Sequence, residues 1–234
     1  MREKRVVVMI SGRGTNMAAL IDAAGERDFP AQIVGVISDN PDASGLAFAA
    51  AKGIPVKALA RADFPSREAH DQAIGATIHA FGGEIVCLAG YMRLLTTAFV
   101  EEWMGRMINI HPALLPLFKG LDTHRRALEA GVRLHGCTVH FVTPEMDAGP
   151  IIAQAAVPVL PDDTEERLYA RVLKAEHRLY PMALRLLAEG KVRIEDGSTV
   201  FSPPAGLVSP DASLFSLSAS ANDVDVEALA RFTP

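Results

Sequence analysis

The sequence is poor in cysteine, since its 234 residues include only Cys87 and Cys137, each within an apolar run. Two cysteines are too few for a structural zinc site. The core that a chain of this length can form needs no disulfide for its stability. We therefore expect two buried thiols in the reduced state.

Positive charge is also scarce. The chain has 23 Lys and Arg residues against 28 Asp and Glu residues, which gives a net charge of −5. This balance provides no overall electrostatic attraction to nucleic acid or to an anionic membrane. An anionic ligand would therefore have to be held by a few local groups.

Long hydrophobic runs are missing as well. The apolar run in "MREKRVVVMISG" is too short for a secretory signal or a membrane span, and no later run is long enough to cross a bilayer. We therefore expect a cytoplasmic protein that acts on small molecules, with no nucleic-acid or membrane partner, as a monomer or a homodimer.

Several common catalytic motifs are absent. The sequence has no G-x-S-x-G nucleophile elbow, no G-K-[ST] of a P-loop and no H-E-x-x-H metal site. An enzyme with this sequence would use a nucleophile that its substrate carries, and we expect no catalytic metal. The remaining histidines are scattered, although His140 lies on a predicted strand shortly before Asp147 and could approach a site there.

The first half of the chain alternates short β-branched runs with helical patterns. Strands are predicted at 5–10, 31–38, 54–59, 84–90 and 106–110, and helices at 17–24, 42–53, 66–81 and 96–104. This alternation predicts an α/β fold with a doubly wound, mostly parallel sheet. Ligands bind such sheets beyond the carboxyl ends of the strands, which directs attention to the loops at 11–16, 88–95 and 109–116.

The pattern changes after residue 120. A short helix closed by Gly131 precedes two strands at 135–143 and 149–159, which we expect to be antiparallel additions to the sheet. A long helix follows at 162–190, with Asp163 and Glu166 in capping-box spacing and with Pro181 expected to kink or divide it. We predict a single domain at 1–200 and a loosely ordered tail, rich in Ser, Ala, Pro and Asp, at 201–234.

The stretch "SGRGTN" joins the first strand to the first helix. Its glycines allow a tight turn, and the helix that follows offers free N–H groups and the positive end of its dipole to an anion. The G-x-G-x-x-G dinucleotide pattern is not met, because Met17 stands where the third glycine belongs. The loop therefore predicts a site for one phosphate group, and the alternative is a plain tight turn.

Asn109 and His111 occupy alternate positions of a predicted strand, so their side chains point to the same face. A carboxamide and an imidazole can both donate to a developing oxyanion, and an imidazole can also transfer a proton near neutral pH. Asp147 in "EMDAGPI" could be the acid beside this histidine. The alternatives are a satisfied polar patch at the strand end and an ordinary turn aspartate.

The blocks "SGRGTNM", "LAGYMRLL", "INIHPALLP", "GLDTHRRALEAG", "HGCTVHFVTPEMDAGPII" and "AEHRLYP" resemble those of the phosphoribosylglycinamide formyltransferases in order and spacing. The resemblance covers roughly residues 5 to 195 and leaves out the tail. It implies a Rossmann-like formyltransferase fold, with ribonucleotide binding in the N-terminal part and folate binding and catalysis in the C-terminal part. It also implies transfer of a formyl group from 10-formyltetrahydrofolate to glycinamide ribonucleotide in purine biosynthesis.

Site residues follow from the same resemblance. It implies that Asn109 and His111 polarise the formyl oxygen, that His111 donates a proton and that Asp147 raises the pKa of His111. It implies ribonucleotide contacts at Gly14, Thr15, Asn16 and Glu176, and folate contacts at Arg67, Met92, Arg93, Leu94, Leu95 and Asn109. Without the resemblance, 91–95 is typical of a helix start and Arg67 of a solvated helix charge.

Three rival functions are also compatible with this sequence. The run Phe118-Lys119-Gly120 also occurs in the related formyltetrahydrofolate deformylases, which hydrolyse the same donor, but those tend to carry a second histidine where this chain has Pro112. They also usually have an N-terminal regulatory domain, whereas this chain begins at the first predicted strand. Formyl transfer to methionyl-tRNA would require a basic RNA-binding domain, whereas the tail here is neutral to acidic. A non-catalytic ligand-binding module is the last alternative.

Overall fold

The computed structural model describes residues 2–202, so almost all of the predicted tail at 201–234 lies outside the described residues. The strands of the main sheet are β1 (Lys4–Ile10), β2 (Ala31–Ser38), β3 (Val56–Ala58), β4 (Ile85–Leu88), β5 (Met107–His111), β6 (Leu134–Phe141) and β7 (Ile151–Pro158). The helices are α1 (Thr15–Ala24), α2 (Ser44–Ala51), the 3-10 helix η1 (Arg61–Asp63), α3 (Arg67–Ala80), α4 (Thr97–Glu102), α5 (Thr123–Glu129) and α6 (Glu165–Ala188).

The main sheet has seven strands in the order β3-β2-β1-β4-β5-β6-β7. The strands from β3 to β5 pair in parallel, whereas β6 pairs antiparallel with both β5 and β7. The predicted α/β fold, mostly parallel with antiparallel additions in the C-terminal half, is therefore confirmed. Among the described residues, no helix is both long enough and apolar enough to cross a membrane.

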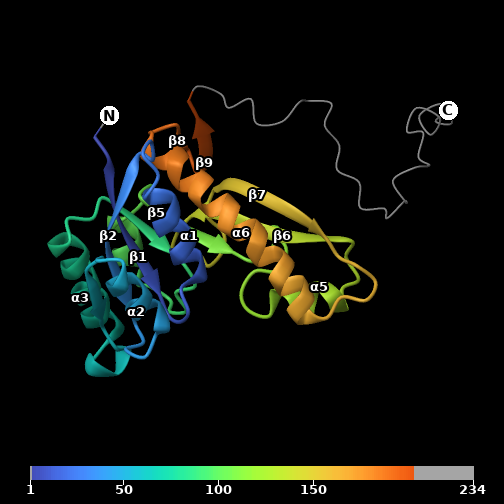
Figure 1. The fold of residues 1–234 in the computed structure, drawn as a ribbon, viewed down its shortest axis with the longest axis horizontal. Helices are drawn as coiled ribbons and strands as arrows, with labels where there is room; N and C mark the ends of the chain where they lie inside the picture. Colours follow the sequence, from blue (N-terminus) through green and yellow to red (C-terminus); the bar gives the residue numbers. More distant parts are fainter. Residues whose placement is uncertain (1, 203–234) are drawn as a thin grey trace.

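Helices cover both faces of the sheet (Figure 1). Alternate residues of β1, such as Val6 and Val8, pack into a core that also contains buried residues of α1, α2, α5 and α6. The intervening residues Val7 and Met9 pack with α3 and α4 on the opposite face. Burial on both faces explains the continuous apolar run of this strand. Cys87 and Cys137 are buried and free, as predicted.

The N-cap residue predicted from the sequence is correct for one helix and wrong for another. Ser66 caps α3 as predicted, since its hydroxyl accepts a hydrogen bond of 3.1 Å from the backbone N–H of Ala69. The N-cap of α6 is Thr164 rather than the predicted Asp163. The reason is that Asp163 is engaged elsewhere, because it accepts from the backbone N–H of Leu160 and pairs with Arg171.

Pro181 was predicted to kink or divide the last helix, and the predicted division is wrong. Helix α6 runs from Glu165 to Ala188 with this proline in its interior. Buried residues on both sides of it, including Tyr180 and Leu184, belong to one core, so packing holds the helix together despite the missing N–H. The Tyr180 hydroxyl also contacts the backbone carbonyls of Leu88 and Ile108 in the sheet.

A two-stranded antiparallel hairpin of β8 (Val192–Glu195) and β9 (Ser198–Phe201) was not predicted. Its turn is formed by Asp196 and Gly197, which both have positive φ. An Asp-Gly pair between short alternating segments is a strong hairpin signal, so the sequence contained the information. The hairpin continues the described fold as far as residue 201.

Candidate active site

A cavity of about 880 Å³ opens at the carboxyl ends of β1, β4 and β5. Its walls include the three loops that follow these strands, as expected for a doubly wound sheet. The predicted site residues that line it are Gly14, Thr15, Asn16, Met92, Arg93, Leu94, Leu95, Asn109, His111, Asp147 and Glu176. Arg67 is not among the lining residues, because it lies exposed at the first position of α3.

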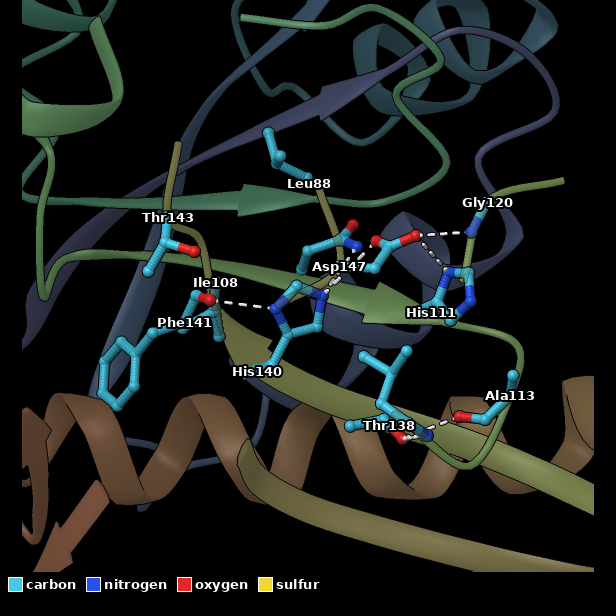
Figure 2. A network of polar contacts seen from close by, with 12 residues as sticks. Leu88, Ile108, His111, Ala113, Gly120, Thr138, His140, Phe141, Thr143 and Asp147 are labelled. Atoms are coloured by element: carbon cyan, nitrogen blue, oxygen red, sulfur yellow. Dashed lines mark hydrogen bonds and ion pairs between the residues drawn. The ribbon is translucent and has the colours of Figure 1, made fainter. Parts of the chain in front are cut away.

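Four polar side chains gather at one end of this cavity, which we call the catalytic end: Asn109, His111, His140 and Asp147. Two paired strands position most of them. In the antiparallel register of β5 and β6, Asn109 lies opposite His140 and His111 lies opposite Thr138. Side chains at alternate positions share a face, so both cross-strand pairs face the same way. Figure 2 shows His111, His140 and Asp147 of this group close to one another.

Asp147 reaches His111 from the loop between β6 and β7. Its backbone has a positive φ of 50°. One carboxylate oxygen, Oδ2, accepts a 2.8 Å hydrogen bond from the backbone N–H of Gly120 and lies 3.5 Å from Nδ1 of His111 (Figure 2). The aspartate is thus both a turn residue and the acid beside the histidine, so the two sequence-based interpretations of Asp147 are compatible.

The imidazole of His111 is 5% exposed and is held at both nitrogens. Its Nε2 lies 3.0 Å from the carbonyl oxygen of Phe118, which can only accept, so Nε2 carries a proton. A proton on Nδ1 would face Asp147 at 3.5 Å, longer than a charge-assisted hydrogen bond of about 2.8 Å. The 3.5 Å separation leaves Nδ1 accessible to an oxygen atom of a ligand in the cavity.

His140 is a buried neighbour of the same group. Its Nδ1 lies 2.9 Å from the carbonyl oxygen of Phe141, its Nε2 lies 3.2 Å from Nδ2 of Asn109, and Nε2 lies 3.8 Å from Oδ1 of Asp147. Burial lowers the pKa of His140, and the Phe141 carbonyl and the Asp147 carboxylate only partly oppose that effect. The expectation that this histidine approaches the site is met by these distances.

The opposite end of the cavity, which we call the glycine-loop end, is formed by residues 11–16 and the facing part of α6. Gly14 precedes α1 with a φ of 70°, and no side chain caps the helix. A Cβ at Gly14 would lie 2.9 Å from Cε of Met17, so the loop favours glycine for space as well as for conformation. The uncapped N–H groups of the first turn are therefore available to an anion.

Asn16 and Glu176 connect α1 to α6 at this end. The Asn16 Nδ2 donates a 2.7 Å hydrogen bond to Oε2 of Glu176, and both residues are buried. Burial raises the pKa of Glu176 to about 7, and the hydrogen bond from Asn16 acts in the opposite direction. The carbonyl oxygen of the Asn16 side chain is buried and has no hydrogen-bond partner among the described residues.

Arg13 and Tyr169 also line this end and were missed from the sequence. The Arg13 Nη2 donates a 2.8 Å hydrogen bond to the Tyr169 hydroxyl, and the guanidinium lies 5.9 Å from the centre of the tyrosine ring. No pattern links two positions so far apart in the sequence. Arg13 itself could have been found, because it is the cation within the glycine loop.

The segment 91–95 forms a wall of the cavity without helical structure. The Arg93 guanidinium bonds to Asp39 at 2.7 Å, and the Met92 N–H donates to the Ser11 hydroxyl at 2.9 Å. Met92 and Leu94 are 69% and 61% exposed. The segment therefore offers an apolar surface beside backbone polar groups, a combination that suits a flat heterocycle.

Residues 4–184 match the family model described as formyl transferase. The chain is 42% identical to the phosphoribosylglycinamide formyltransferase of Escherichia coli K12, across 86% of this chain and 97% of the relative. It is 48% identical to part of the trifunctional purine biosynthetic protein adenosine-3 of Drosophila melanogaster, but it spans only 14% of the length of that relative.

Solved structures show the same likeness. The glycinamide ribonucleotide transformylase 1 of Symbiobacterium toebii superposes with a TM-score of 0.83 at 48% identity, over 85% of this chain and 94% of that one. The phosphoribosylglycinamide formyltransferase of Brucella melitensis superposes with a TM-score of 0.77 at 59% identity, over 80% of this chain and 96% of that one. A formyltetrahydrofolate deformylase of Pseudomonas syringae superposes with a TM-score of 0.79 at 29% identity, over 86% of this chain and 66% of that one.

Proposed function

The chain belongs to the formyl transferase family, and we propose that it transfers the formyl group of 10-formyltetrahydrofolate to the amine of glycinamide ribonucleotide in purine biosynthesis. The observation that carries this proposal is one cavity with an anion-binding loop at one end and a carboxylate–imidazole–carboxamide group at the other. A phosphorylated amine and a formyl donor can therefore meet in the same space.

The proposed reaction needs no nucleophile from the protein. The substrate amine forms a bond to the formyl carbon, the formyl oxygen gains negative charge in a tetrahedral intermediate, and the bond from that carbon to N10 of the folate breaks. One proton leaves the amine, and one reaches the folate nitrogen. N–H groups of Asn109 and His111 stabilise the oxyanion, His111 supplies a proton, and the Asp147 carboxylate holds His111 as the imidazolium.

The glycine-loop end supports the proposed place for the acceptor. We assign the ribonucleotide contacts to Gly14, Thr15, Asn16 and Glu176, as the sequence resemblance implies. The phosphate would lie against the free N–H groups of α1, where no acidic side chain occupies the first turn. Arg13 adds a guanidinium beside this helix end, because only part of its donor set is taken by Tyr169.

The folate donor is assigned to the wall at 92–95. Met92, Leu94 and Leu95 offer apolar contact there, whereas the side chain of Arg93 is occupied by Asp39, so the backbone of the segment would hold the polar edge of the ring. Asn109, which lines the same cavity, is assigned to the folate donor as well. The folate contact of Arg67 stays a prediction. Because Arg67 does not line the cavity, it would contact a part of the donor that extends outside it.

The rival activity is hydrolysis of the same donor. Higher sequence identity favours the transferases, at 59% for the Brucella melitensis structure and 29% for the deformylase structure. We also propose a cytoplasmic location and a monomer or homodimer, which cell fractionation and light scattering would test.

The decisive assay incubates the protein with 10-formyltetrahydrofolate, with and without glycinamide ribonucleotide, and follows release of tetrahydrofolate. We expect release that depends on the ribonucleotide and equals the amount of formylated product. Release at the same rate without the ribonucleotide would identify a hydrolase, and no release in either mixture would identify a binding module.

A further inference from the structure

The protonation state of His140 follows from its two partners. Nδ1 faces the carbonyl oxygen of Phe141 at 2.9 Å, and a carbonyl oxygen only accepts, so Nδ1 carries the proton. Nε2 faces the Nδ2 amide group of Asn109 at 3.2 Å, and an amide nitrogen only donates, so Nε2 must be the acceptor. The two contacts together are compatible only with the neutral Nδ1–H tautomer of His140.

This tautomer fixes the side chain of Asn109. One N–H of the carboxamide is directed to Nε2 of His140, so the planar amide cannot turn over without losing that hydrogen bond. Its second N–H has no partner among residues 2–202, and the residue lines the cavity. The amide is therefore presented to the cavity as a donor. With the opposite orientation, the places of its nitrogen and oxygen would be exchanged, and an oxyanion there would meet a carbonyl oxygen instead.

We propose that His140 is a positioning residue that, as the neutral Nδ1–H tautomer, orients the Asn109 carboxamide so that its free N–H stabilises the formyl oxyanion. The inference rests on the proposed formyl transfer. It assigns to β6 a part in the reaction that Asn109 on β5 cannot fulfil alone, because the cross-strand partner decides which atom of the amide faces the substrate.

Protonation of His140 would reverse this arrangement. An imidazolium has a donor at both nitrogens, so Nε2–H would oppose the Asn109 N–H and favour a turned amide. The charged groups that face this ring are Asp147, 3.8 Å from Nε2, and His111 on β5. The carboxylate would draw a charged His140 away from Asn109 and compete with His111 for the same oxygens. Burial of His140 works against this charged form.

A double-mutant cycle tests whether His140 acts through Asn109. We expect His140→Ala to lower kcat about tenfold or more, below the 10²–10³-fold range for loss of an oxyanion donor. In an Asn109→Ala background the same change should alter kcat by less than about twofold, because the orienting contact has no target. Losses that multiply in the double variant would overturn the proposal.

A spectroscopic measurement keeps the proposal testable even if His140→Ala fails to fold. In the uniformly ¹⁵N-labelled wild-type protein at pH 7, we expect Nδ1 of His140 to be protonated and Nε2 to be bare. On acidification, the side-chain amide signals of Asn109 should shift together with the ring signals of His140. The inference would be rejected by an Nε2–H tautomer of His140 at pH 7, or by Asn109 amide signals that do not shift while His140 titrates.

The two proposals fail in different ways. If wild-type protein shows no acceptor-dependent turnover, formyl transfer itself is refuted, whatever the tautomer. If wild-type turnover is normal and the cycle is multiplicative, only the positioning role of His140 is refuted.

Discussion

The parallel and antiparallel parts of the sheet supply different things to the same cavity. The parallel strands β1, β4 and β5 end in loops that present backbone N–H groups, a helix N-terminus and an apolar wall. The antiparallel addition of β6 and its loop brings titratable side chains, His140 and Asp147, against the end of β5. The proposed acceptor site and the proposed proton chemistry thus lie at different ends of the cavity, and β5 contributes Asn109 and His111 to the chemistry.

This difference shows what an antiparallel strand adds to a doubly wound fold. A parallel neighbour would present another loop at the same edge. Strand β6 instead runs back along β5, so its side chains face those of Asn109 and His111 along the strand, and its loop folds over the sheet to reach His111. Substitutions in the two regions should therefore affect catalysis and binding separately.

The largest effect is expected from Asp147→Asn at the catalytic end. The amide keeps the size of the side chain and can still accept the Gly120 N–H, but the negative charge beside His111 is lost. Because the imidazolium loses its counter-ion, kcat should fall by about 10²–10⁴-fold, the range typical of proton transfer by a positioned side chain. Steady-state kinetics at saturating substrates measure this change.

A matched control is Asp196→Asn in the β8–β9 turn. That aspartate has nearly the same φ, 49° against 50°, but lies exposed in a turn outside the cavity lining. Its variant should keep the wild-type kcat. A comparable loss in both variants would trace the effect to the turn conformation and not to the charge at His111.

The second effect concerns stability at the glycine-loop end. Burial raises the pKa of Glu176 to about 7 in the folded state, against an ordinary value of 4.5 for a solvated glutamate. The folded state therefore binds the Glu176 proton more tightly than the unfolded state. The contribution of this protonation to stability is complete below pH 4.5 and is lost as pH rises through 7. Glu176→Gln mimics the protonated form and should be more stable than wild type by roughly 3 kcal/mol at pH 8, with little difference at pH 4.5.

Urea unfolding at the two pH values measures this prediction. Glu101→Gln, at an exposed position of α4, is the control and should change stability by less than about 0.5 kcal/mol at either pH. Equal stability changes at pH 4.5 and pH 8 for Glu176→Gln would contradict the buried ionisation.

A smaller effect is expected from Arg13→Ala, which removes a cation from the glycine-loop end. The lost charge-assisted hydrogen bonds to the phosphate should raise the KM for glycinamide ribonucleotide about tenfold, while kcat changes little. Arg27→Ala, an exposed arginine beyond the other end of α1, should leave both constants unchanged. A fall in kcat without a rise in KM would place Arg13 in the chemical step instead.

The smallest effect is expected from Lys119→Met. Lys119 pairs with Glu145 at 3.3 Å, and both side chains are solvent-accessible. Exposed ion pairs contribute less than about 1 kcal/mol, and the hydrogen bond from Gly120 to Asp147 remains to hold the loop. Thermal unfolding should change little, and turnover should keep its dependence on the acceptor. Acceptor-independent turnover in this variant would make Lys119 a determinant of the reaction.

The parallel part of the fold could be predicted because its signals are local. The strand at 31–38 has the predicted bounds, and Ser66 caps its helix as predicted. The catalytic end depends on contacts between distant segments, so the residues alone left Asp147 either as a turn residue or as an acid, and only the family resemblance gave it a role. The Arg13–Tyr169 contact was missed for the same reason, whereas the β8–β9 hairpin was missed despite a local Asp-Gly signal.

The most direct test of the division between binding and chemistry is isothermal titration of glycinamide ribonucleotide into the Asp147→Asn protein. If the glycine-loop end binds the acceptor independently of the catalytic end, the Kd should stay within about twofold of the wild-type value while kcat collapses. A loss of acceptor binding in parallel with the loss of turnover would contradict the account, because one group of residues would then serve both purposes.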